Sequence, residues 1–205
     1  MQSATMDHRH SAGCQCANED VGEKFSLYRF VNVPGLQALN AVEPDKLKDI
    51  LRPEHEKRGH EDLYVESDDD DQLILVIPFV GSVRLRKIII MCAGDECPTE
   101  VRLYKNMEVG FDTDAAPTQT LRLGPDPAGE LEMSVVAPKF NDCRTLSLFF
   151  PESVGGDKTR IYYIGLLGDH IKPQEKLTGV VYESKPQLKD HETRADQAGS
   201  NNLGM

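Results

Sequence analysis

The sequence contains no tryptophan and few aromatic residues of any kind (6%). Its apolar runs all fall short of the roughly 20 residues that a membrane-spanning helix needs. Residues 1–10 are polar and charged, which is not the pattern of a secretory signal. We therefore expect a soluble protein of the cytoplasm, with the nucleus as a second compartment, and no association with membranes. A chain of 205 residues is long enough for one domain with a sizeable core.

Basic residues are scarce relative to acidic ones. The chain has 23 lysines and arginines against 34 aspartates and glutamates, which gives a formal net charge of -11. Nucleic-acid binding relies on clustered lysine and arginine that pair with phosphates, so this balance argues against a nucleic-acid partner. It favours a protein partner with a basic surface.

Sequence motifs of enzymes and cofactor sites are also missing. The chain has no Gly-x-Ser-x-Gly nucleophile turn and no glycine-rich phosphate loop of the Walker or Rossmann kind. Four histidines lie in polar, loop-like sequence without a neighbouring nucleophile motif: His55, His60, His170 and His191. We therefore expect no catalytic residues, no bound cofactor and no enzymatic activity.

The five cysteines include no Cys-x-x-Cys pair; they are Cys14, Cys16, Cys92, Cys97 and Cys143. An odd count in a chain without a secretory signal predicts reduced thiols and not a disulfide framework. Cys92 ends an apolar segment and is expected to pack as a small hydrophobic residue. A redox pair of Cys92 and Cys97 across the intervening turn is the alternative.

One group of residues near the N-terminus has the composition of a metal site: His8, His10, Cys14 and Cys16. Two imidazoles and two thiolates suit tetrahedral zinc or copper. The Cys-x-Cys spacing is tighter than the Cys-x2-Cys of a standard zinc finger. The alternative is therefore a flexible tail that collects zinc adventitiously.

Short apolar segments with a period of two fill the middle of the chain. Residues 83–91 are predicted to form a central strand with Val83, Leu85 and Lys87 on one face and Ile88 on the other. Further strands are predicted at 131–135, 146–150 and 160–167, the last followed by a turn at Gly168–Asp169. Turn clusters at 124–127 and 155–157 separate these segments. This pattern predicts an all-β, antiparallel sandwich or barrel.

Helical structure is expected only in short turns near the start of the domain. Pro44 is a suitable first residue for a short helix that ends at Leu51, before Pro53. A second helical turn is predicted after Pro34-Gly35, over residues 36–39. The segments 1–24 and 183–205 carry little core material and are predicted to be disordered tails, which leaves 25–182 as the folded domain.

The ordered set of segments resembles the PITH domain. The residues that carry the resemblance include Ile77-Pro78-Phe79, Cys97-Pro98, Phe111-Asp112, Lys139-Phe140 and the run from Tyr163 to Gly168. PITH domains occur C-terminal to thioredoxin in thioredoxin-like proteins that associate with the proteasome, and they also occur alone. The resemblance implies a jelly-roll β-sandwich similar to galactose-binding domains. It also implies an accessory or adaptor role on the proteasome regulatory particle or another large intracellular assembly.

Two charged segments are candidate contacts for such a protein partner. The acidic run Asp68, Asp69, Asp70 and Asp71 suits a basic surface, whereas Arg84 and Arg86 share one strand face that suits an acidic one. Calcium binding is an alternative for the acidic run, although it lacks the spacing and the glycine of an EF-hand. The alternative function is accordingly a small-ligand, carbohydrate- or calcium-binding β-sandwich.

Four aromatic residues are candidate interface anchors: Tyr104, Phe111, Phe149 and Tyr162. The simpler interpretation is that they belong to the core. We favour this interpretation for Phe149 and for one of the neighbours Tyr162 and Tyr163.

Overall fold

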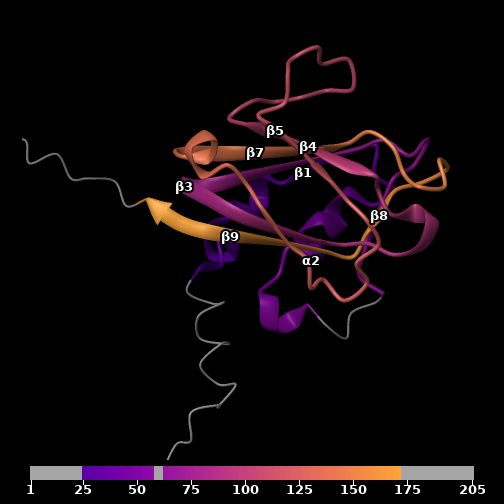
Figure 1. The fold of residues 1–205 in the computed structure, drawn as a ribbon, viewed down its shortest axis with the longest axis horizontal. Helices are drawn as coiled ribbons and strands as arrows, with labels where there is room; N and C mark the ends of the chain where they lie inside the picture. Colours follow the sequence, from indigo (N-terminus) through magenta and orange to yellow (C-terminus); the bar gives the residue numbers. More distant parts are fainter. Residues whose placement is uncertain (1–24, 58–61, 172–205) are drawn as a thin grey trace, which may run out of the picture. The chain divides into compact units, whose positions relative to one another are not determined.

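The structure is a computed structural model that describes residues 25–57 and 62–171 (Figure 1). Antiparallel strands dominate this part of the chain. The strands are β1 (Gln37–Leu39), β2 (Val65–Glu66), β3 (Leu73–Met91), β4 (Glu100–Lys105), β5 (Gln119–Arg122), β6 (Glu132–Ser134), β7 (Cys143–Phe150), β8 (Arg160–Ile161) and β9 (Tyr163–Ile171). The prediction of an all-β antiparallel sandwich is confirmed.

Helical segments are short in the described residues. The α-helix α2 spans Leu47–Ile50, and the 3-10 turns are η1 (Tyr28–Phe30), η2 (Val33–Gly35), η3 (Pro44–Lys46), η4 (Glu54–Glu56), η5 (Gly94–Glu96) and η6 (Ala137–Phe140). The predicted helix from Pro44 is confirmed, because η3 leads into α2 and Leu51 caps its end. No helix within 25–57 and 62–171 is long and apolar enough to cross a membrane.

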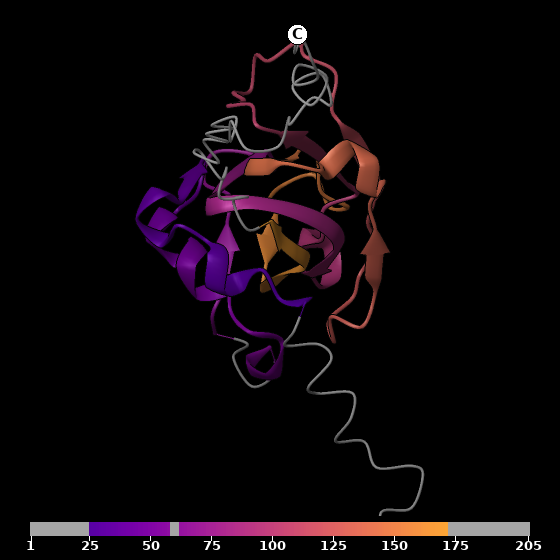
Figure 2. The same ribbon diagram turned by 90° about the vertical axis from the view of Figure 1, so that its left-hand side faces the viewer.

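The long strand β3 organises both layers of the sandwich, and Figure 2 shows it as an arc across the domain. Its first half pairs with β1 and β7, and the sheet continues through β4 to β5. Its second half pairs with β9 and β6. The main hydrophobic core joins residues of both halves, such as Leu75 and Ile90, with β4, β7 and β9. The core therefore lies between the two layers that β3 connects.

The face alternation of β3 differs from the prediction because the strand contains a bulge. Leu85 pairs with Gly168 and Lys87 with Leu167, so one residue of β3 has no counterpart in β9. The alternation is reset there: Ile88 joins Val83 and Leu85 in the main core, and Lys87 is exposed. The predicted common face of Val83, Leu85 and Lys87 is therefore wrong beyond Leu85.

Two predicted local structures are replaced by strands. Residues 37–39 form β1, which pairs with β3, and not a helical turn. Gly168 and Asp169 do not form a turn, because β9 continues through them and pairs with β3 as far as Ile171. In both places pairing with β3 supplies backbone hydrogen bonds that an isolated segment lacks.

The prediction of reduced thiols is wrong for two cysteines. Cys92 and Cys97 form a disulfide, and their Cα atoms lie 4.9 Å apart across η5. This turn folds the chain back within the distance that a disulfide requires, which an odd cysteine count does not reveal. Cys143 is a buried free thiol, and burial raises its pKa to about 12. Of the predicted domain, residues 58–61 and 172–182 lie outside the described residues, as do both tails.

Candidate interaction surface

Three loops meet beside the small sheet of β2 and β8. The loop segment 66–72 starts at the last residue of β2, the loop 92–99 contains the disulfide, and the loop segment 151–160 runs from the end of β7 to the first residue of β8. The backbone N–H of Ser153 donates to Asp71 Oδ2 at 2.8 Å, and Thr159 Oγ1 donates to the Asp71 carbonyl at 2.6 Å. Gly155 N donates to the Asp95 carbonyl at 2.7 Å. These bonds bind the three loops into one surface, which we call the acidic end.

The acidic end carries a large excess of negative charge. Its three loops contain nine aspartates and glutamates, against one lysine and one arginine. The carboxylates come from separate parts of the chain, since Glu96, Glu152 and Asp157 are remote in sequence from the run at 68–71. Convergence of the loops therefore concentrates a charge that the sequence distributes.

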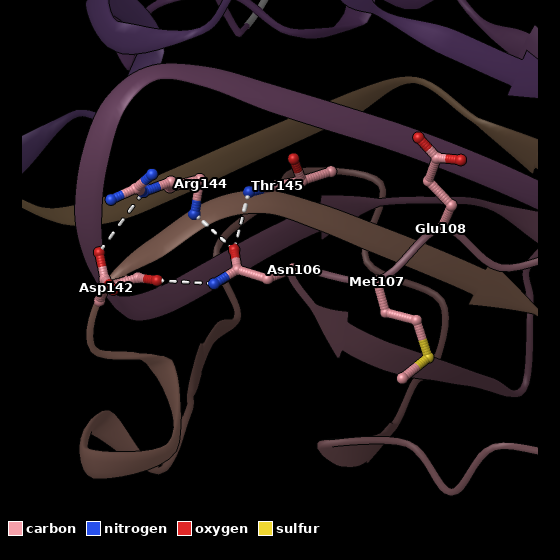
Figure 3. Close-up of a pocket in the computed structure, with 6 residues that line it drawn as sticks. All are labelled: Asn106, Met107, Glu108, Asp142, Arg144 and Thr145. Carbon is pink, nitrogen blue, oxygen red and sulfur yellow. Dashed lines mark hydrogen bonds and ion pairs between the residues drawn. The ribbon is translucent and has the colours of Figure 1, made fainter.

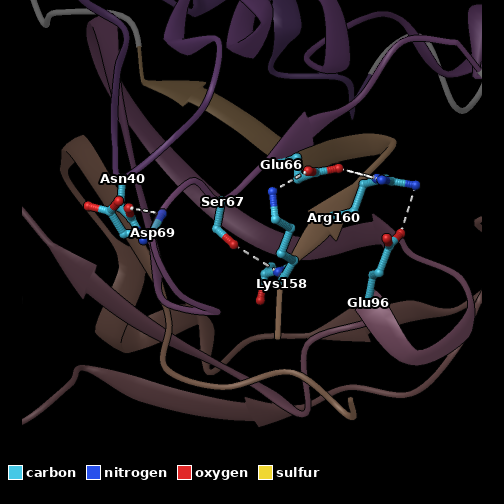
Figure 4. A network of polar contacts seen from close by, with 8 residues as sticks. Asn40, Glu66, Ser67, Asp69, Glu96, Lys158 and Arg160 are labelled. Carbon is cyan, nitrogen blue, oxygen red and sulfur yellow. Dashed lines mark hydrogen bonds and ion pairs between the residues drawn. The ribbon is translucent and has the colours of Figure 1, made fainter. Parts of the chain in front are cut away.

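Asn40 fixes the conformation of the acidic run. Its backbone is in the left-handed region (φ 58°), and its Nδ2 donates to Asp70 Oδ1 at 2.7 Å and to the Gln72 carbonyl at 2.7 Å. The Asp69 N–H donates to Asn40 Oδ1 at 3.1 Å, a contact visible in Figure 4. Asp70 and Asp71 thus use their carboxylates within the protein. Asp68, Asp69 and Asp70 are exposed, and of these three Asp70 is held by Asn40.

The two cations of the acidic end are engaged by glutamates (Figure 4). Lys158 Nζ lies 2.9 Å from Glu66 Oε1, and Arg160 contacts Glu66 through Nε at 2.8 Å and through Nη2. Arg160 Nη1 also lies 2.8 Å from Glu96 Oε2. The direct ion pairs of these cations are thus with Glu66 and Glu96, while the hydrogen bond to Glu66, helped by the charge of Asp68, raises the pKa of Lys158.

The environment of Glu66 keeps its carboxyl ionised. Burial acts to raise the pKa of Glu66, but hydrogen bonds and charge from Lys158 and Arg160 outweigh it, so the pKa lies below the ordinary 4.5. Arg160 also lies over the ring of Tyr64, with Cζ 4.6 Å from the centroid. These contacts join β2 and β8 to the loop of Glu96.

The calcium interpretation of the acidic run does not match its geometry. Asp70 accepts from Asn40 and Gln72, whereas Asp71 accepts from Ser153, so the two carboxylates serve different partners. Within the described residues, no three acidic, histidine or cysteine side chains are grouped so that they could hold a metal ion. The other predicted metal ligands, His8, His10, Cys14 and Cys16, lie outside the described residues.

The basic pair on β3 is exposed, as predicted, but its charge is shared with neighbours. Arg84 Nε donates to Asn141 Oδ1 at 2.6 Å, and Arg86 forms an ion pair with Asp169 at 2.8 Å. The adjacent Lys87 pairs with Glu132 at 2.6 Å. Arg86 and Lys87 are therefore paired with carboxylates, whereas the neutral amide of Asn141 leaves the charge of Arg84 in place.

The four aromatic candidates differ in exposure. Tyr104 is 3% exposed and Phe149 9%, so both belong to a core cluster on the outer face of the first sheet. Tyr163 is buried and Tyr162 partly buried. The favoured interpretation is confirmed for Phe149 and for Tyr163. Phe111 is the exposed member of the set, at 42%.

Comparison with known sequences agrees with the resemblance to the PITH domain. The sequence model of the PITH domain matches residues 17–186. The chain is 37% identical over 203 residues to PITH domain-containing protein CG6153 of Drosophila melanogaster, which covers 93% of this chain and 96% of that protein. It is 36% identical over 199 residues to PITH domain-containing protein 1 of Homo sapiens, which covers 91% and 94%.

Comparison with solved structures gives the fold. The CBM32-1 and CBM32-2 domains of ZmpB from Clostridium perfringens match with a TM-score of 0.55 at 9% identity, over 79% of this chain and 41% of that one. The same domains in complex with GalNAc match with a TM-score of 0.55 at 10% identity, over 76% and 40%. The prediction of a jelly-roll sandwich similar to galactose-binding domains is confirmed.

Proposed function

Because this chain belongs to the PITH domain family, we propose that it is a non-catalytic interaction module that binds a basic protein surface through its acidic end. The observation that carries the proposal is the fixed, exposed pair Asp68 and Asp69. Asn40, Asp70 and Asp71 provide the internal hydrogen bonds that hold this loop in place. A loop that is already ordered loses little conformational entropy when it binds.

Charge at this surface favours rapid and selective encounter with a basic partner. Complementary potentials raise association rates and discriminate against partners of the same sign. The cations Lys158 and Arg160 stabilise the surface from within by pairing with Glu66. They leave Asp68 and Asp69 to face the partner.

We propose the proteasome regulatory particle, or another large intracellular assembly, as the source of the basic surface. Support for this choice comes from the thioredoxin-like proteins that carry a PITH domain and associate with the proteasome. The protein would then be an accessory or adaptor factor in the cytoplasm and nucleus. Carbohydrate binding is not carried over from the GalNAc complex, because a likeness at 10% identity concerns the fold alone.

The test is affinity purification from native cytosol of the source organism, with quantitative mass spectrometry. The wild-type chain is compared with Asp68→Asn/Asp69→Asn and with the charge-matched control Asp45→Asn/Asp62→Asn, which changes two exposed aspartates outside the acidic end. We expect the wild type and the control to recover the same assembly, and the first variant to recover at least fivefold less. The proposal would be overturned if Asp68→Asn/Asp69→Asn recovered that assembly in full. It would also be overturned if no form of the protein recovered any assembly.

A further inference from the structure

The loop that joins β4 to β5, residues 106–118, is pinned at its base to the start of β7. Asn106 (φ 53°) and Asp142 (φ 55°) both have left-handed backbones, and Asn106 Nδ2 donates to the Asp142 carbonyl at 2.8 Å. Asn106 Oδ1 accepts from the backbone N–H groups of Arg144 at 2.7 Å and Thr145 at 3.1 Å (Figure 3). Two strained residues that hold each other are a feature of preorganised sites.

An open pocket of about 350 Å³ lies at this base, where β4 ends and β7 begins, away from the acidic end. It is lined by Asn106, Met107, Glu108, Asp142, Arg144 and Thr145. Figure 3 shows the side chains of Met107 and Glu108 directed to opposite sides of the chain. The pocket therefore offers an apolar thioether and the Glu108 carboxylate next to a rigid backbone, and its one lining cation, Arg144, lies 3.8 Å from the Asp142 carboxylate. Met107 is 40% exposed.

The tip of the loop is ordered as well. Gly110 N donates to Thr113 Oγ1 at 2.7 Å, and Thr113 N donates to the Gly110 carbonyl at 3.1 Å, which closes a tight turn around Phe111. The Phe111 ring meets Phe149 edge-on, with centroids 6.2 Å apart and an interplanar angle of 75°. An exposed aromatic ring that is already fixed can anchor a partner without a large entropic cost.

The charge of the loop has one sign. Residues 106–118 contain Glu108, Asp112 and Asp114 and no lysine, arginine or histidine. All three acidic residues are exposed. A second copy of this chain, with its net charge of -11, or an anionic membrane would be repelled here. A basic segment of another protein would be attracted.

We infer that the loop 106–118 and the pocket at its base form a second docking surface, which takes a linear peptide containing an apolar residue beside a lysine or arginine. The apolar side chain packs on Phe111 or Met107, and the basic side chain faces Glu108, Asp112 or Asp114. Aromatic anchors provide affinity in such contacts, and the charged rim provides rate and selectivity. A module with two separate surfaces can bridge two partners, which goes beyond the function proposed for the acidic end.

The test uses a phage-displayed library of random linear peptides, selected on the full chain. We expect an enriched consensus with lysine or arginine next to an apolar residue. A synthetic peptide of that consensus is then titrated by calorimetry into the wild type, Phe111→Ala and Asp112→Asn/Asp114→Asn. We expect at least tenfold weaker binding to Phe111→Ala, and weaker, less salt-sensitive binding to the aspartate variant.

Two controls separate this surface from the acidic end. Asp68→Asn/Asp69→Asn should bind the peptide as the wild type does, and so should Val154→Ala, which changes another exposed apolar residue. Phe111→Leu retains an apolar side chain and checks that any loss is not a folding defect, as do matching circular dichroism spectra. An acidic consensus, no enrichment over a protein-free selection, or affinity unchanged in Phe111→Ala would overturn the inference. None of these results bears on the acidic end, which is tested separately by the affinity purification.

Discussion

Asn40 and Asp70 lie thirty positions apart in the sequence, and they join at 2.7 Å to hold the acidic run against the start of β3. Asn40 uses both ends of its amide for this purpose, because its oxygen accepts from Asp69 N while its nitrogen serves Asp70 and Gln72. Its left-handed backbone directs the side chain into the loop. One residue outside the run thus sets the shape of the surface.

Replacement of Asn40 should therefore destabilise the domain in two separable ways. Asn40→Ala loses the hydrogen bonds and puts alanine, which tolerates a left-handed backbone less well than asparagine, at this position, and we expect a loss of about 2–3 kcal/mol in the free energy of unfolding. Asn40→Gly loses the bonds but accepts the backbone, so we expect about 1–2 kcal/mol. Urea denaturation measures both. Equal stability of Asn40→Ala and the wild type would contradict this role.

Gly168 is required where β9 passes the bulge of β3. A Cβ atom at this position would overlap the carbonyl oxygen of Arg84, and neither backbone can move without disturbing the sheet. We expect Gly168→Ala to lower the free energy of unfolding by about 3 kcal/mol. Gly124→Ala is the matched control, since its Cβ would meet no atom within 4 Å. Thermal unfolding compares the two, and similar midpoints would refute the close approach.

The ion pairs of Glu66 should make stability depend on pH. The pKa of Glu66 is lower in the folded chain than its ordinary 4.5, so the stabilisation is present above that value and is lost as the pH falls through the folded pKa. We expect Glu66→Gln to cost about 2 kcal/mol near neutral pH, because a largely buried carboxylate loses charged hydrogen bonds. The difference from the wild type should shrink below a pH of about 4.5.

Urea denaturation at neutral and acidic pH tests this linkage. Glu132→Gln is the control, because its pair with Lys87 is exposed (side chains 42% and 46%) and should contribute less than about 0.5 kcal/mol. A difference between Glu66→Gln and the wild type that stays constant from neutral to acidic pH would show that the charge of Glu66 is not its source.

The cysteines of the described region should become accessible to alkylation under different conditions. Burial raises the pKa of Cys143 to about 12, so its thiol is both neutral and shielded near neutral pH. Iodoacetamide should leave it unmodified in the native chain and should modify it after denaturation without reductant. Cys92 and Cys97 should require reduction first. Peptide mass spectrometry reads each site, and alkylation of Cys92 in unreduced protein would contradict the disulfide.

Local patterns in the sequence were sufficient for several strands and for the helix at Pro44, but not for β1, which was predicted as a helical turn. Alternation identified β6 and β7, and proline marked the start of η3. The alternation failed at Leu85, because a bulge depends on pairing with β9 and leaves no local signal. It failed again at Gly168, where a glycine that resembles a turn residue permits close packing of two strands.

The candidate surface was only partly predictable for a related reason. The acidic run was evident as a block of charge, but its association with Glu96, Glu152 and Asp157 depends on loops that meet through hydrogen bonds between distant residues. The exposure of Arg84 and Arg86 was predictable, whereas their pairing with Asn141 and Asp169 was not. The Gly155-Gly156 turn and the turn between Cys92 and Cys97 were the local signs of further loops at this end.

The sequence by itself determined the class of the fold, the sign of the charge and the family, because composition, periodicity and the order of short motifs are properties of the chain. The tertiary structure decided which charges remain unneutralised, which aromatic residue reaches solvent and which cysteines are joined. These properties depend on distances between residues that are far apart in the chain, and only the packing of the two layers fixes those distances.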